Sequence, residues 1–270
     1  MNYKTRTVSI TSGKGGVGKT TMVCNLALRL SQLGKKVLIL DGDLGMANVD
    51  IFFGIKSTNS IRDVIYGDKE MKDIMTEVSK DVFLIPGGSG LVDFNFMNNF
   101  ERRAVLDSIG SLPHDFDYLL IDTAPGIAEN VLFLNSAAKT VSVVITPDPA
   151  SFTDAYALIK VLNTFYKVNH FSIMCNQVLD EAEGFRLYQR FNEVVNRFLV
   201  VGFDYWGSVP LDPAMRKANQ NQRLIMRHDP MAESTKAIRQ IVAQMDKATL
   251  CHSEGTGGIQ MFWEQVVGFA

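Results

Sequence analysis

The chain has 270 residues, of which 46% are hydrophobic and 21% charged, and its formal net charge is −2. This length and composition fit one large α/β domain, and the charge excludes an overall basic field that would attract nucleic acid. Its three cysteines are widely spaced and form no C-x-x-C pair, which argues against a zinc ribbon or an iron–sulfur bridge.

The first predicted strand, residues 6–11, leads into a glycine-rich stretch that reads Gly-Lys-Gly-Gly-Val-Gly-Lys-Thr-Thr. This stretch fits the phosphate-loop pattern G-x-x-x-x-G-K-S/T, and an apolar periodicity predicts a helix over residues 20–33 directly after it. A glycine loop at a helix N-terminus surrounds an anion with backbone N–H groups. The residues expected to bind the phosphates of a nucleotide are Gly13, Gly15, Gly16, Val17, Gly18, Lys19, Thr20 and Thr21. Lys19 is expected to reach the β- and γ-phosphates, and the Thr20 hydroxyl to bind Mg²⁺.

Two later strands end in carboxylates. Residues 37–41 form a continuous apolar run that ends at Asp41, and residues 118–122 repeat this pattern and end at Asp122. Such runs are typical of strands buried on both faces of a parallel sheet, and open α/β sheets keep their sites at the carboxyl ends of the strands. An acidic residue at this place in a phosphate-loop protein holds Mg²⁺ through its water shell. Asp122 is therefore a candidate metal residue.

The remaining elements alternate between strand and helix. Between the two carboxylate strands lie a predicted strand at 82–86, a glycine-rich loop at 87–90 and a helix near 100–110. The later strands are expected at 140–146, 171–176 and 205–209, with helices at 153–166 and 183–198. This alternation predicts a doubly wound, mostly parallel sheet in one domain over residues 1–250. Asn176 ends a strand, where its amide could either recognise adenine or cap the strand end.

The glycine-rich stretch, with Lys14 directly after its first glycine, resembles the deviant Walker A motif of the MinD/ParA ATPases. The resemblance implies hydrolysis of ATP to ADP and phosphate by an ATP-dependent homodimer, with Lys14 crossing the dimer interface to the partner's nucleotide. A solvated loop lysine is the alternative. Asp43 would orient or activate the attacking water, Asp41 would lie nearer the magnesium, and Asn48 would contact the γ-phosphate region. A turn with two solvated aspartates is the other interpretation of Asp41 and Asp43.

The resemblance also extends to the base and to one branch of the family. Asn176 would read adenine, and the backbone from Pro210 to Asp212 would flank the ring. Residues 43–50, 148–160 and 209–218 are similar to the flagellar-number regulators, FlhG and FleN. That branch implies control of flagellar number and placement, with an FlhF-type GTPase, a FleQ-type transcription activator or flagellar switch proteins as partners. A MinD-type regulator of the division site and a ParA-type DNA-segregation ATPase remain alternatives, although nucleic-acid binding would need a basic dimer face.

The last residues differ in composition from the domain. Residues 251–258 are predicted to be a flexible linker, and residues 259–270 a helix with one apolar stripe, formed by Ile259, Phe262, Trp263, Val266 and Val267. This helix could lie on a membrane surface or dock on its own domain, and it carries no Lys or Arg to favour anionic lipid. Because no signal peptide and no apolar run of about 18 residues occur, we expect a cytoplasmic protein that can associate reversibly with a membrane.

Overall fold

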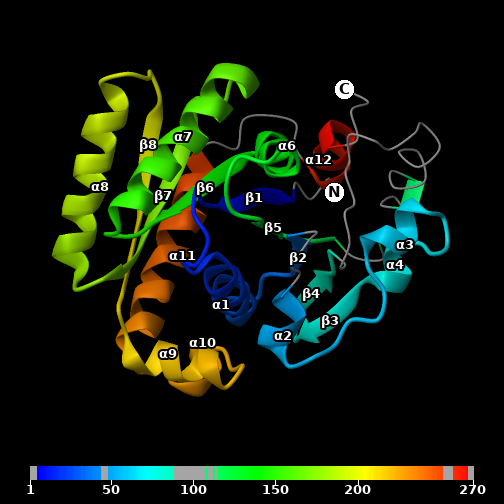
Figure 1. The fold of residues 1–270 in the computed structure, drawn as a ribbon. Helices are drawn as coiled ribbons and strands as arrows, with labels where there is room; N and C mark the ends of the chain where they lie inside the picture. The colour runs from blue at the N-terminus through cyan, green and yellow to red at the C-terminus, as the bar shows by residue number, and fades with distance from the viewer. Residues whose placement is uncertain are drawn as a thin grey trace.

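The computed structural model describes residues 5–43, 48–87, 107–108, 112, 115–251 and 258–266. In this part of the chain, an eight-stranded sheet has the order β3-β4-β2-β5-β1-β6-β7-β8 (Figure 1). All of its pairings are parallel except that of β3 with β4. The strands are β1 (Arg6–Thr11), β2 (Val37–Gly42), β3 (Thr76–Ser79), β4 (Val82–Ile85), β5 (Tyr118–Thr123), β6 (Thr140–Ile145), β7 (His170–Val178) and β8 (Gly202–Pro210). The predicted doubly wound, mostly parallel sheet is confirmed.

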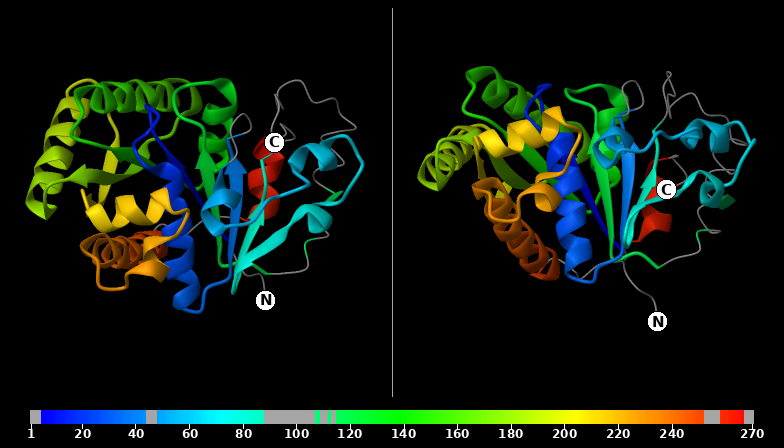
Figure 2. Two further views of the ribbon diagram at one scale, coloured as in Figure 1. Left: turned by 60° about the horizontal axis from the view of Figure 1, so that its bottom comes forward. Right: turned by 90° about the horizontal axis from the view of Figure 1, so that it is seen from below.

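Helices cover both faces of the sheet, as the two views in Figure 2 show. One face carries α1 (Lys19–Gln32), α2 (Val49–Phe53), α9 (Pro213–Gln220), α10 (Ile225–His228) and α11 (Glu233–Cys251). The other face carries α3 (Ile61–Ile65), α4 (Met71–Ile74), α6 (Glu129–Ala137), α7 (Pro149–Tyr166), α8 (Glu181–Asn196) and α12 (Ile259–Val266).

The central strands are apolar along their whole length because both of their faces are covered. On β2, Val37 and Ile39 belong to the core beneath α1, whereas Leu38 and Leu40 belong to the core beneath α6. This division follows from the two-residue side-chain period of a strand. Because these strands are parallel, their carboxyl ends lie at one edge of the sheet. This edge carries the loop from β1 to α1 and the acidic residues at the ends of β2 and β5.

A few expectations differ from the structure or fall outside its described part. Leu33, which the periodicity places on the apolar face of the first helix, lies just beyond the end of α1 and is 48% exposed. Of the helix expected near 100–110, only residues 107–108 are described, and they are helical. The loop expected at 87–90 lies outside the described residues except for Gly87.

The C-terminal helix packs on the domain. α11 continues through Cys251, the first residue of the predicted linker, and residues 252–257 lie outside the described part. α12 lies beside α6 (Figure 1), and Phe262, Trp263 and Val266 are at most 4% exposed within the apolar core that includes Leu134. No helix among the described residues combines the length and apolar character needed to cross a membrane.

Candidate nucleotide site

The glycine loop between β1 and α1 is packed against two other elements. Gly18 has φ of 94°, in the left-handed region that glycine adopts without strain. A Cβ on Gly18 would lie 2.5 Å from the Asn176 amide nitrogen, and one on Gly13 would lie 2.1 Å from the Asp154 carbonyl carbon in α7. Both positions therefore require glycine, and the loop is held in place against α7 and the end of β7.

Lys19 lies inside the loop rather than on its surface. Its side chain is buried, and Nζ donates a hydrogen bond of 2.9 Å to the Ser12 hydroxyl, which in turn donates to the Lys14 carbonyl at 2.6 Å. Burial lowers the pKa of Lys19, against the opposing effect of the nearby Asp122 and Asp43 carboxylates. A buried cation at a helix N-terminus favours a bound anion, as the phosphate-loop pattern predicts.

Two buried carboxylates stand side by side at the ends of adjacent strands. Asp41 of β2 is in register with Asp122 of β5, and each is 2% exposed. Burial raises the pKa of Asp122 to about 7; the charge of Asp43 adds to this, while a hydrogen bond with Thr20 and the charge of Lys19 oppose it. Burial and then the charge of Asp122 raise the pKa of Asp41 to about 8. A cation between such carboxylates would stabilise their ionised forms.

The donor atoms around Asp122 suit Mg²⁺. Asp122 Oδ1 is buried and has no hydrogen-bond partner among the described residues, and the Thr20 hydroxyl is within reach of the same carboxylate. All of these donors are hard oxygens, which Mg²⁺ prefers. Within the described ranges, no group of three or more His, Cys, Asp or Glu could hold a metal. Proteins usually hold Mg²⁺ through one or two carboxylates, water and substrate phosphates.

Asp41 has a structural role that its sequence pattern did not predict. Its Oδ1 accepts a hydrogen bond from the backbone N–H of Asp43 at 3.2 Å. Its Oδ2 accepts from the N–H groups of Asn48 and Val49 at 3.0 and 3.2 Å. Asp41 therefore joins the end of β2 to the start of α2 and holds both ends of the segment that connects them.

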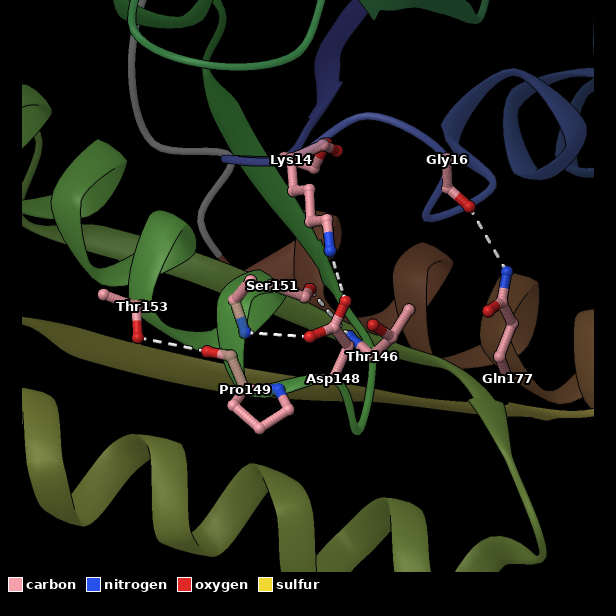
Figure 3. A network of polar contacts seen from close by, with 10 residues as sticks. Lys14, Gly16, Thr146, Asp148, Pro149, Ser151, Thr153 and Gln177 are labelled. Atoms are coloured by element: carbon pink, nitrogen blue, oxygen red, sulfur yellow. Dashed lines mark hydrogen bonds and ion pairs between the residues drawn. The ribbon is translucent and has the colours of Figure 1, made fainter.

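Lys14 lies near the surface and forms an ion pair with Asp148 of its own chain (Figure 3). The Asp148 side chain also accepts a hydrogen bond of 2.9 Å from the Ala150 N–H and so caps α7. The two side chains are 40% and 46% exposed. Lys14 is therefore not buried with the phosphate-binding residues, and its ammonium group is accessible.

The end of β7 supports the loop from the other side. The Asn176 amide donates to the Val17 carbonyl at 2.7 Å, and the Gln177 amide donates to the Gly16 carbonyl at 3.3 Å (Figure 3). Pro210 lies on the neighbouring strand β8, opposite Val178. The Asp212 carboxylate caps α9 through the Ala214 N–H and accepts from the backbone and hydroxyl of Ser234. The candidate base-binding residues thus lie on neighbouring strand ends, and the carboxylate of Asp212 is already bound by Ala214 of α9 and Ser234 of α11.

The structure brings most of the predicted site residues to one edge of the sheet. Sequence reasoning did not identify Ser12, Asp148 or Gln177. Ser12 directly precedes the loop, and that position could have suggested its role. Asp148 and Gln177 contact residues 134 and 161 positions away in the sequence, and no local pattern indicates such pairings.

A glycine loop between β1 and α1, with carboxylates at the ends of β2 and β5, defines a P-loop NTPase fold. The AAA domain family, AAA_31, matches residues 5–175. The antiactivator FleN of Pseudomonas aeruginosa is 34% identical over 98% of this chain and 94% of its own length. The flagellum site-determining protein YlxH of Helicobacter pylori is 33% identical over 88% of this chain and 80% of its own.

Solved structures agree with these sequence matches. The septum site-determining protein MinD complexed with Mg-ADP, from Pyrococcus horikoshii OT3, has a TM-score of 0.68 and 26% identity. The match covers 93% of this chain and 100% of that protein. The chain therefore belongs to the MinD/ParA family of P-loop ATPases, and it is similar to the antiactivator FleN and the flagellum site-determining protein YlxH.

Proposed function

We propose that the chain is an ATP-hydrolysing switch that dimerises with ATP and regulates the number and placement of bacterial flagella. The observation that carries this proposal is the 34% identity to the antiactivator FleN over 98% of the chain. The geometry of the loop and of the two strand-end carboxylates supports the ATPase part of the proposal.

In this proposal, the phosphates bind the backbone of residues 13–21 and the buried ammonium group of Lys19. Mg²⁺ is held by the Thr20 hydroxyl and Asp122, with Asp41 beside them, and it would neutralise charge on the β- and γ-phosphates. Asp43 orients the attacking water, and Asn48 lies on the γ-phosphate side. Asn176 and the backbone at Pro210 and Asp212 hold the base.

Lys14 completes the site of a second copy. Its side chain is partly exposed and pairs with Asp148 at the start of α7. It does not contribute to the phosphate-binding interior of its own loop, which supports a role toward another subunit. A cation supplied across an interface stabilises charge on the transferring phosphoryl group, as an arginine finger does. Hydrolysis would therefore depend on dimerisation, and the Lys14–Asp148 ion pair must open before Lys14 can act.

The output of the switch is proposed to pass through protein partners and the C-terminal tail. By resemblance, the partners are an FlhF-type GTPase, a FleQ-type transcription activator or flagellar switch proteins. We further propose reversible membrane association through residues 259–270, which requires α12 to leave the core in which Phe262 and Trp263 are buried. The two tails of a dimer would bind more strongly than one through avidity.

A MinD-type role at the division site is the second candidate. The septum site-determining protein MinD of Thermotoga maritima is 33% identical over 58% of this chain, a shorter match than that of FleN. A ParA-type role in DNA segregation has less support, because the net charge of −2 provides no basic field for DNA. Flagellar count, division-site placement and a salt-dependent DNA gel shift with ATP separate the three functions.

The test combines a mechanistic and a cellular measurement. We expect Asp43→Ala to bind ATP and accumulate as a dimer without turnover, and Lys19→Gln to lose nucleotide binding and remain monomeric. Mass photometry with ATP and a phosphate-release assay measure both outcomes. In cells, deletion of the gene should change the flagellar count, and wild-type but not Lys19→Gln should restore it. A monomeric Asp43→Ala protein at saturating ATP contradicts the switch, and an unchanged flagellar count contradicts the flagellar role.

A further inference from the structure

A groove of about 560 Å³ lies along the outer edge of β8; its lining includes Pro210, a candidate base-binding residue, but no residue of the phosphate loop. β8 is the last strand of the described sheet and pairs only with β7. α11 forms one wall of the groove, and the start of α8 forms the other, because these helices pack on opposite faces of β8 (Figure 2). Trp206 and Gly207 of β8 lie between the walls.

The groove has the length of a short strand. Its α11 wall extends from Glu233 to Gln244, which lie 11 positions apart in the sequence. At a helical rise of about 1.5 Å per residue, this wall is about 16 Å long. An extended peptide advances about 3.3 Å per residue, so about five residues fit along the wall.

The edge of β8 is irregular at the centre of the groove. The register with β7 passes from Tyr205 opposite Ile173 to Gly207 opposite Met174, so Trp206 is an extra residue at a β-bulge. The Trp206 side chain is 1% exposed, and its indole N–H has no hydrogen-bond partner among the described residues. The Trp206 side chain belongs to the apolar core with Ile238 and Ile241, so the bulge marks the point where the edge of β8 departs from regular pairing.

The charge of the groove indicates what could occupy it. Asp180, Glu181 and Glu233 line it together with one lysine, Lys236, which already pairs with Glu233 at 2.7 Å. The excess of carboxylates favours a cationic occupant. A second copy of the chain would bring the same acidic walls together, and like-charge repulsion would disfavour this contact.

We propose that this groove binds an extended peptide segment of a partner protein that carries Arg or Lys, and that the segment adds to the sheet beside β8. Main-chain hydrogen bonds to an exposed edge give such complexes their affinity, and side-chain contacts give them specificity. The basic side chain contacts Glu181 and Asp180 at the α8 end of the groove. The segment runs beside Gln240 and Gln244, two exposed amides on the α11 wall.

The test uses the full chain and a short fluorescent peptide of alternating valine and arginine, with binding followed by polarisation. We expect Glu181→Lys to weaken binding about tenfold, which corresponds to about 1.4 kcal/mol. The matched control is Glu193→Lys, a charge reversal on the same helix at a residue that pairs with Arg197 outside the groove. It should bind the peptide like wild type. ATP affinity, measured in parallel, should be unchanged in both variants and shows that each has folded.

Two further measurements locate the binding mode. Methylation of alternate peptide nitrogens should abolish binding, because it removes the donors that pair with β8. Hydrogen exchange should slow at residues 205–208 when the unmodified peptide is added. The proposal is overturned if a glutamate-for-arginine peptide binds equally well, or if Glu181→Lys binds like wild type. The chain could also self-associate without ATP and lose this association in Gln240→Arg. That result would assign the groove to a second copy and would overturn the proposal.

Discussion

Lys14 of the phosphate loop is bound by Asp148, a carboxylate of the same chain that begins α7. The pair joins the loop to a helix that also contacts Gly13 through its backbone. In the proposed dimer, the Lys14 ammonium group has to approach the nucleotide of the other subunit. The intramolecular ion pair then competes with the intermolecular contact, and it favours the monomer.

We therefore expect Asp148→Asn to strengthen ATP-dependent dimerisation about two- to fivefold, a modest gain because the ion pair is solvent-exposed. Asparagine retains the ability to cap α7, so the helix start should be preserved. Analytical ultracentrifugation with a non-hydrolysable ATP analogue measures the dissociation constant. Glu193→Gln, which removes another exposed carboxylate far from the loop, is the matched control. Weaker dimerisation of Asp148→Asn than of this control would contradict the competition.

Asn176 supports the loop through the 2.7 Å bond from its amide to the Val17 carbonyl. We expect Asn176→Ala to reduce the affinity for GTP about fivefold, because the variant loses a support of the loop that both nucleotides use. The affinity for ATP should fall further, because the proposed contact with adenine is also lost. Competition binding with a fluorescent nucleotide provides both constants. Equal losses for the two nucleotides would show that Asn176 supports the loop and does not bind adenine.

The strands that carry the site could be predicted because they are buried on both faces. The apolar runs that precede Asp41 and Asp122 are typical of buried parallel strands, and the structure places both carboxylates at the same edge of the sheet. β3 could not be found in this way. It is a short, antiparallel strand at the edge of the sheet, and three of its four residues, Thr-Glu-Val-Ser, are polar. Its pattern therefore does not differ from that of a surface loop.

The contacts within the site were harder to predict from the sequence than its motifs. Spacing alone identifies the loop around Lys19, because phosphate binding requires those residues in that order. The Lys14–Asp148 pair and the Gln177–Gly16 bond depend on how the ends of separate strands meet. Asp41 was expected near the metal. Its three backbone hydrogen bonds come from residues two to eight positions further along the chain, and no residue pattern there indicates them.

The buried Asp122 carboxyl should make stability depend on pH. Its pKa is about 7 in the folded chain, against an ordinary value of 3.8, so the folded state keeps a proton that the unfolded state releases. The free energy of unfolding of the chain without metal or nucleotide should therefore fall as the pH rises from about 4 to about 7. Asp122→Asn cannot ionise, and its stability relative to wild type should increase over this interval.

Urea unfolding at several pH values between about 5 and 8 measures this difference. Asp68→Asn, which removes an exposed carboxylate, is the control and should show no such trend. Mg²⁺ with ATP should reverse the trend in the wild type, because the cation stabilises the ionised carboxylate. A constant difference between Asp122→Asn and wild type across the interval would show that Asp122 is ionised in the folded chain throughout.

α12 is held mainly by Phe262, Trp263 and Val266. Burial of these three apolar side chains offsets little more than the entropy lost when a short helix is ordered, so docking is marginal. Ala137→Glu places a charge in the same core, where Ala137 is 8% exposed, and should release the tail with its apolar face intact.

We expect Ala137→Glu with ADP to bind liposomes better than the wild type with ADP, because its tail is released. It should bind less well than the wild type with ATP, because the proposed dimer binds through two tails. Trp263→Ala should lower binding in both nucleotide states, since the loss of the largest membrane contact outweighs the effect of weaker docking. Because residues 259–270 contain no Lys or Arg, binding should not increase when anionic lipid is added. Sedimentation with liposomes of either composition measures all of these effects. Equal, weak binding of Ala137→Glu and wild type with ADP would show that docking of α12 does not limit access to the membrane.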